Sequence, residues 1–154
     1  MKMSDAGLKM LKELEGSVKH IYRDSAGLDT IGVGHLLTED EKKTNKFKDG
    51  LTDEQIIDLL REDVKHAENA VASLVKVNLN QNQIDTLISF TFNVGRGALA
   101  SSSLLRKLNA GDHDAVPVEL MKWNKLRNPK TRKLEASKGL TKRREREATC
   151  WVMI

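Results

Sequence analysis

The sequence contains few of the residues that mark special structural classes. Among its 154 residues there are one cysteine and two prolines, and only 4% are aromatic. The lone Cys150 cannot form an intrachain disulfide, so nothing requires an oxidising compartment. No apolar run approaches the roughly 18 residues of a membrane-spanning helix. With 39% hydrophobic and 31% charged residues, the composition is typical of a soluble globular protein of one domain.

Two further absences concern location and metals. The first residues lack the apolar stretch, about 7–15 residues long, of a secretory signal. We therefore expect the chain to mature in the cytoplasm, and something else must release it if its substrate lies outside the membrane. The four histidines (His20, His35, His66 and His113) show no metal-ligand spacing, so we expect no metal site and no cofactor.

Positive charge is concentrated near the C-terminus. The formal net charge is +4, but residues 122–146 contain eleven Lys and Arg against two acids, Glu135 and Glu145. Such a region suits an anionic partner: nucleic acid, acidic lipid, or a cell wall that carries carboxylates and phosphates. Charge alone does not separate these three partners.

The spacing of apolar residues predicts an α+β fold. A helix capped by Ser4 ends near Gly16, and a glycine-punctuated, β-rich stretch follows over residues 21–37. The capping box Thr52-x-x-Gln55 begins a long helix to about residue 75. Further helices are predicted to begin at Asn80, Ser101 to Ser103, Asp114 and Thr141. We expect an N-terminal lobe over about 15–60, a linking helix over about 53–75, and a helical C-terminal lobe over about 76–154 with the first helix packed on it.

Glu15 occupies a position where helical periodicity favours an apolar residue. Leu8, Leu11, Glu15 and Val18 are spaced i, i+3, i+7 and i+10. A carboxyl group on an apolar face is desolvated, which favours the protonated form that a general acid needs. The alternative is a helix-end glutamate whose stem packs while its head reaches water.

Asp24 and Thr30 are the next polar residues of interest. Asp24 adjoins a predicted turn, where an aspartate commonly caps its own backbone. In a strand over residues 30–34, Thr30, Gly32 and Gly34 would share one face, and two glycines there would let another molecule approach the backbone. An acid, a second carboxylate and a hydroxyl around an open groove are typical of an inverting glycosidase.

These residues form a pattern that resembles the bacteriophage-type lysozymes, the endolysins of glycoside hydrolase family 24. The pattern consists of Glu15-Gly16, then Tyr22-Arg23-Asp24-Ser25-Ala26-Gly27, then Thr30-Ile31-Gly32-Val33-Gly34-His35. The Glu…Asp…Thr spacing of nine and six residues matches that family's catalytic triad. Blocks over residues 83–95, 103–111, 123–124 and 139–147 are also similar to the family. One departure is residues 126–138, where many relatives carry a short Gly-Gly loop; this puts the shape of that edge of the cleft in doubt.

The resemblance implies a lysozyme-like fold and a muramidase that cuts peptidoglycan between N-acetylmuramic acid and N-acetylglucosamine. Glu15 would be the general acid, and Asp24 and Thr30 would hold the attacking water, which gives inversion. Gly32, Gly34 and His35 would line the substrate, although His35 could equally be a hydrogen-bonded anchor of the lobe. Arg144, rather than Arg143, would turn inward to support the acid. The enzyme would be a monomer that acts in the periplasm after release through a separate holin-type pore, without membrane insertion.

Two other classes of function compete with this interpretation. A lytic transglycosylase cuts the same bond without water, but it needs no water-holding partner such as Asp24 or Thr30. A non-enzymatic module that binds nucleic acid or the wall would explain the basic C-terminal region. It would not explain Glu15 on an apolar face or the Thr30-x-Gly-x-Gly strand. We therefore expect an enzyme with no nucleic-acid partner.

Overall fold

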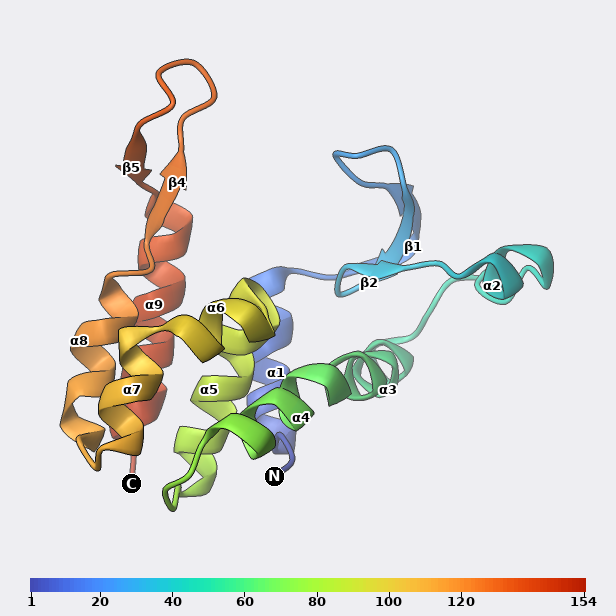
Figure 1. Cartoon of the computed structure of the whole chain (residues 1–154). Helices are drawn as coiled ribbons and strands as arrows, with labels where there is room; N and C mark the ends of the chain where they lie inside the picture. Colours follow the sequence, from blue (N-terminus) through green and yellow to red (C-terminus); the bar gives the residue numbers. More distant parts are fainter. The chain divides into compact units, whose positions relative to one another are not determined.

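The computed structural model describes all residues from Met1 to Ile154, and its helices and strands are shown in Figure 1. Backbone contacts divide the chain into two compact units. The N-terminal unit is Ser4–Lys65, and the C-terminal unit is His66–Ile154 together with Met1–Met3. No helix combines the length and the apolarity needed to span a bilayer.

The N-terminal unit packs helix α1 on helix α3. Its elements are α1 (Asp5–Glu15), β1 (Val18–Arg23), β2 (Asp29–Gly32), β3 (His35–Leu36), α2 (Glu39–Lys43) and α3 (Asp53–Asp63). Ser4 caps α1 as predicted, because its side chain accepts a hydrogen bond from the N–H of Gly7 at 3.0 Å. Gly16 ends α1 with φ +75°, a backbone conformation that glycine adopts without strain. Helix α1 therefore begins and ends where the sequence predicts.

The sheet of this unit has three antiparallel strands in the order β1-β2-β3. Tyr22 pairs with Thr30, and Thr30 pairs with Leu36, so β2 lies in the middle. All six residues of β1 are exposed, whereas Thr30, Ile31 and Gly32 of β2 are buried. The central strand thus carries the packed face, and it also carries one of the predicted site residues.

The sequence predicted one linking helix over residues 53–75, and the structure instead has two helices. Helix α3 ends at Asp63 and α4 (Lys65–Leu74) begins after Val64, whose N–H bonds to the Leu60 carbonyl. The capping box of Thr52 and Gln55 is present as predicted. Val64 is fully buried, so apolar residues keep their helical spacing across the break. A prediction from that spacing therefore shows one continuous helix. The packing of the first helix on the C-terminal lobe stays a prediction.

The C-terminal unit is built mainly from helices that pack around α5 and α9. Its elements after α4 are α5 (Gln81–Val94), α6 (Arg96–Ser101), α7 (Ser103–Asn109), the 3-10 turn η1 (His113–Ala115), α8 (Val116–Met121), β4 (Lys125–Arg127), β5 (Leu134–Ala136) and α9 (Lys138–Val152). Helix α9 packs on both α5 and α8. The core includes Leu87, Ile88, Phe90, Leu104, Leu108 and Leu120, each with no exposed surface. An α+β fold is therefore confirmed.

Two helix starts in this unit differ from the predictions. Asp112, rather than Asp114, caps η1 by accepting from the N–H of Ala115 at 3.2 Å, and α8 follows directly. Helix α9 begins after Ser137, four residues before Thr141, because the Ser137 side chain accepts from the N–H of Leu140. Each true cap is another small polar residue a few positions away, and local sequence does not rank such neighbours.

Residues 125–136, in the segment where the sequence departs from many relatives, form a β-hairpin. Strand β4 pairs antiparallel with β5, with Leu126 opposite Glu135 and Arg127 opposite Leu134. The two strands have three residues each, and all six residues are exposed. This hairpin is visible as the strand pair β4 and β5 in Figure 1. Strands this short carry too few residues to display an alternating pattern, which explains why the sequence did not reveal them.

Candidate active site

Glu15 is the last residue of α1 and is exposed. The prediction that it lies desolvated on an apolar face is therefore wrong. The apolar spacing that suggested burial included Val18, but Gly16 ends the helix and Val18 begins strand β1. Exposure at the end of a helix instead gives the Glu15 carboxyl direct access to a molecule in solution.

Asp24 organises the turn between β1 and β2. Its Oδ1 accepts hydrogen bonds from the N–H groups of Ala26 and Leu28, each at 2.9 Å. The N–H of Asp24 also donates to the Leu28 carbonyl, and Gly27 in the same turn has φ +79°. The aspartate therefore caps its own backbone, and this fixes the direction of its carboxylate. Oδ2 accepts none of these bonds and is open to another donor.

Thr30 is connected to the same turn through Leu28. The Thr30 hydroxyl donates to the Leu28 carbonyl at 2.9 Å, while the Leu28 N–H donates to Asp24 Oδ1. The backbone of one residue thus holds both side chains, which lie six positions apart in the sequence. Thr30 is only 2% exposed, so a further hydrogen bond to its oxygen requires a molecule held directly against it.

Gly32 and Gly34 do not form the strand face that the sequence predicted. Strand β2 ends at Gly32, and Val33 and Gly34 form a tight turn into β3. Both glycines have positive φ, +66° and +67°, so each is needed for the turn. A Cβ on Gly32 would meet Leu59 at 3.5 Å, whereas one on Gly34 would meet nothing. The substrate contact proposed for these two residues stays a prediction.

His35 is held between two carboxylates. Its Nδ1 lies 2.8 Å from Asp63 Oδ2, and its Nε2 lies 2.9 Å from Glu41 Oε1. The ring also meets Phe47 edge-on, with centroids 5.9 Å apart. Both ring nitrogens face acceptors, and only the doubly protonated ring donates to both. These contacts support the anchoring role for His35, because they tie β3 to α2 and α3.

Burial lowers the pKa of His35, but hydrogen bonds with Glu41 and Asp63, together with their negative charges, outweigh it and raise the pKa above its ordinary 6.5. For Glu41, burial raises the pKa, and hydrogen bonds from the Thr38 N–H and from His35 bring it below its ordinary 4.5. The imidazolium and the carboxylate therefore stabilise each other between these two pKa values.

We predict that His35→Gln destabilises the protein most at mildly acid pH. Because the folded-state pKa of His35 is raised, its contribution is complete below the unfolded pKa of about 6.5 and is lost as pH rises through the folded pKa. The urea midpoints of the wild type and the variant should differ most near pH 5.5 and converge toward pH 9. His20→Gln is the matched control. A gap that does not change with pH would contradict this assignment.

Arg144 lies in the C-terminal unit and is fully buried. Its Nε donates to the Trp123 carbonyl at 2.9 Å, its Nη1 bonds to Glu147, and its Nη2 bonds to Asn93. The guanidinium also lies 5.0 Å from the Phe90 ring centroid. Arg144 is thus rigidly held, as a residue that positions a catalytic group must be. Its support of Glu15 stays a prediction.

Arg143 joins the same buried group through different partners. It donates to the Ser89 carbonyl at 3.0 Å, and its Nε lies 3.5 Å from Glu147 Oε2. The same Glu147 oxygen accepts from the Ser89 hydroxyl at 2.6 Å. Arg144, rather than Arg143, lines a pocket of about 420 Å³ together with Asn93 and Trp123.

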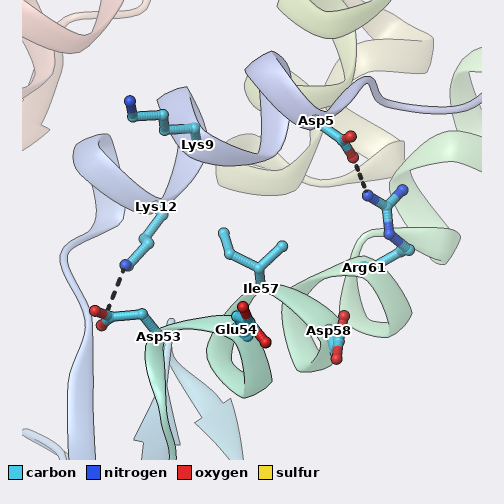
Figure 2. Close-up of a pocket in the computed structure, with 8 residues that line it drawn as sticks. All are labelled: Asp5, Lys9, Lys12, Asp53, Glu54, Ile57, Asp58 and Arg61. Atoms are coloured by element: carbon cyan, nitrogen blue, oxygen red, sulfur yellow. Dashed lines mark hydrogen bonds and ion pairs between the residues drawn. The ribbon is translucent and has the colours of Figure 1, made fainter.

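A larger groove of about 550 Å³ runs between α1 and α3 (Figure 2). Ile57 lies between two ion pairs, Lys12 with Asp53 and Arg61 with Asp5, which join the two helices. None of the predicted site residues lines this groove. It is therefore separate from the candidate active site.

The sequence did not predict the two carboxylate partners of His35. Glu41 is the last residue of a capping box with Thr38, which the pattern Thr-x-x-Glu could have revealed. Asp63 lies 28 residues from His35, and no local pattern connects them. The structure contains no group of three or more His, Cys, Asp or Glu side chains placed to hold a metal ion.

Comparisons with known proteins cover nearly the whole chain. Residues 12–147 match the family model described as phage lysozyme. The endolysin of Salmonella phage P22 is 42% identical over 127 residues, which cover 81% of this chain and 85% of the relative. The endolysin of Acyrthosiphon pisum secondary endosymbiont phage 1 is 38% identical over 148 residues, covering 96% and 95%.

A solved structure gives the same result. The endolysin from Escherichia coli O157:H7 phage FAHEc1 is similar with a TM-score of 0.83 and 32% identity, covering 99% of this chain and 94% of that one. The lysozyme-like fold is therefore confirmed. The matched range includes the positions of Glu15, Asp24 and Thr30. From the family model, the relatives and the fold together, this chain belongs to the phage lysozyme family and is a lysozyme-type hydrolase.

Proposed function

We propose that this lysozyme hydrolyses the β-1,4 bond between N-acetylmuramic acid and N-acetylglucosamine in bacterial peptidoglycan, with inversion. Membership of the phage lysozyme family and relatives named as endolysins support the substrate class. The observation that carries the mechanism is the backbone of Leu28, which holds Asp24 and Thr30 together.

Glu15 supplies the proton in this proposal. A general acid must reach the glycosidic oxygen, and the exposed end of α1 leaves the Glu15 carboxyl accessible. As the bond breaks, the carboxyl gives its proton to the leaving oxygen. Arg144, fixed by Glu147, Asn93 and Trp123, is proposed to support the acid.

Asp24 and Thr30 place the attacking water. Asp24 Oδ1 is occupied by two backbone N–H groups, which aims Oδ2 in a fixed direction and leaves it able to accept a water O–H. The Thr30 hydroxyl uses its proton on the Leu28 carbonyl, so its oxygen can only accept a further bond. A water that donates one O–H to each of these two acceptors keeps its lone pairs free, and one of them can attack the sugar carbon. The carboxylate takes up the proton that this water loses.

The products distinguish hydrolysis from transglycosylation. We expect mass spectrometry of muropeptides released in ¹⁸O-labelled water to show one ¹⁸O atom per cut and no anhydro sugar. Asp24→Asn should lower turnover about 10²–10⁴-fold, because the amide keeps the turn but cannot accept the proton. Asp29→Asn, in the next strand, is the matched control and should keep full activity. Anhydro products, or an active Asp24→Asn variant, would contradict the water-based mechanism.

We propose that the enzyme acts as a monomer on the periplasmic side of the wall, after passage through a separate holin-type pore. Relatives named endolysins support action on the wall at host lysis. Loss of lysis in cells that express the lysozyme without a pore protein would support this route of release.

A further inference from the structure

The connection between α1 and β1 carries Glu15 between two lysines. Glu15 is the last residue of α1, and Gly16 ends the helix with φ +75°. Lys12 lies in the last turn of α1, and Lys19 is the second residue of β1. The proposed acid therefore lies where a helix passes into a strand, and its direction depends on how this junction is held.

One carboxylate meets both of these lysines. Asp53 Oδ1 lies 3.7 Å from Lys12 Nζ and 3.6 Å from Lys19 Nζ. Figure 2 shows the first of these ion pairs, which reaches from α1 to the start of α3. Without the carboxylate, two ammonium groups beside the same point would repel each other. With it, the two sides of the junction are drawn toward one oxygen.

The backbone before α3 brings Asp53 to this place. The Leu51 N–H donates to the Lys19 carbonyl at 2.8 Å. Gly50 has φ +79°, and a Cβ there would lie 2.6 Å from the His20 ring and 2.8 Å from the Lys19 carbonyl oxygen. Residue 50 therefore has no room for a side chain, and the segment that leads into α3 lies directly against β1.

Thr52 fixes Asp53 at the start of α3. The Thr52 hydroxyl accepts from the Gln55 N–H at 3.1 Å, and the Gln55 side chain accepts from the Thr52 N–H at 2.8 Å. Asp53 is the first residue of this capped helix, where a negative charge suits the helix N-terminus. Its carboxylate is thus presented from a well-defined element rather than from a loose loop.

Helix α3 also contacts the strand that carries Thr30. It packs on α1, β2 and β3 within the same unit. Leu59 of α3 lies 3.5 Å from the place that a Cβ on Gly32, the last residue of β2, would take. Farther along α3, Arg61 pairs with Asp5 at the start of α1 (Figure 2). One helix thus holds both the element with the proposed acid and the element with Thr30.

We propose that Asp53 is a positioning residue for proton transfer by Glu15. Its pairs with Lys12 and Lys19 fix the α1–β1 junction, and this directs the Glu15 carboxyl toward the glycosidic oxygen. The inference rests on the proposed function, in which Glu15 is the acid. A displaced acid lowers the rate of bond breaking but not the affinity for substrate, because it acts only in the transition state. The Asp53 side chain is 68% exposed, so its ion pairs add little to global stability.

The test uses two soluble substrates that differ in their need for an acid. One is a tetrasaccharide of alternating N-acetylglucosamine and N-acetylmuramic acid, whose leaving sugar oxygen must receive a proton. The other is the dinitrophenyl β-glycoside of the corresponding disaccharide. Its phenolate leaves without a proton, because the nitro groups stabilise the negative charge. In both reactions water attacks the sugar carbon and Asp24 takes up its proton, so only the role of the acid differs.

Four kinds of variant isolate the carboxylate and its two partners. Asp53→Asn removes the charge, and Asp53→Glu keeps it. Asp58→Asn is the matched control, because Asp58 lies on the same helix and lines the same groove but forms none of these ion pairs. The fourth variant combines Lys12→Gln with Lys19→Gln, and it is made with and without Asp53→Asn.

We expect Asp53→Asn to lower kcat on the tetrasaccharide about tenfold and on the dinitrophenyl glycoside less than about twofold. KM and the urea midpoint should stay near the wild-type values. Asp53→Glu and Asp58→Asn should remain within about twofold of the wild type on both substrates. The variant without Lys12 and Lys19 should lose as much as Asp53→Asn, and combining the two changes should add no further loss, because both remove the same interaction.

Three results would overturn the proposal: a wild-type kcat for Asp53→Asn, an equal loss on both substrates, or additive losses in the combined variant. Glu15→Gln separates these results from a failure of the proposed function. It should be inactive on the tetrasaccharide and active on the dinitrophenyl glycoside. If Glu15→Gln instead treats the two substrates alike, Glu15 is not the acid, and the proposed function fails whatever Asp53 does.

Discussion

Glu15→Gln is expected to lower the rate of lysis about 10²–10⁴-fold, the contribution typical of a positioned general acid. Glutamine has nearly the same shape but carries no proton that it can give to the leaving oxygen. Because residue 15 is exposed at the end of α1, the change buries no unsatisfied group and the fold should be retained. The measurement is the loss of turbidity of outer-membrane-stripped cells, with circular dichroism as the check on folding.

The matched control is Glu13→Gln, the same chemical change two residues earlier on the same helix. It should retain activity, because Glu13 has no part in the proposed reaction. If the Glu15→Gln protein has a native spectrum and keeps more than a few per cent of wild-type lysis, another group donates the proton.

The second large effect concerns stability. Glu147→Gln should lower the free energy of unfolding by about 3–5 kcal/mol, because it removes the carboxylate from a buried pair and leaves the Arg144 charge without its counter-ion. Glu147 and Arg144 have no exposed surface, so water cannot replace the lost interaction. The Ser89 hydroxyl donates to the same carboxylate, so it would also lose its charged acceptor.

Urea unfolding of the variant and the wild type at neutral pH measures this loss. Glu145→Gln, an exposed position on the same helix, is the control and should change stability by no more than about 0.5 kcal/mol. Equal stability of the Glu147→Gln variant and the wild type would mean that the buried group does not depend on the carboxylate charge.

The sequence predicted most reliably those helix starts that local chemistry determines. The caps at Ser4, Thr52 and Asn80 involve side chains that bond to backbone groups three residues away, so a short motif contains the whole interaction. The break at Val64 was missed because burial continues across it. The hairpin β4–β5 was missed because its strands are too short to show a period.

For the site, the sequence named candidate residues but did not show how they are held. The burial expected for Glu15 was wrong because the apolar period was extended past Gly16 into a strand. The link from Asp24 to Thr30 through Leu28 depends on backbone directions in a turn, and residue identity does not specify these directions. The partners of His35 require tertiary structure, since Asp63 lies on another element.

Glu41 belongs to two interactions at once, and this limits how the family can vary. Its carboxylate accepts the N–H of Thr38 to complete a helix cap, and it also holds the His35 ring. Glutamine at position 41 would preserve the cap but not the charge that favours an imidazolium. Substitutions at positions 35 and 41 should therefore be correlated across homologous sequences. Positions 38 and 41 should also covary, including in sequences that lack the histidine. A single side chain thus joins two otherwise separate evolutionary constraints.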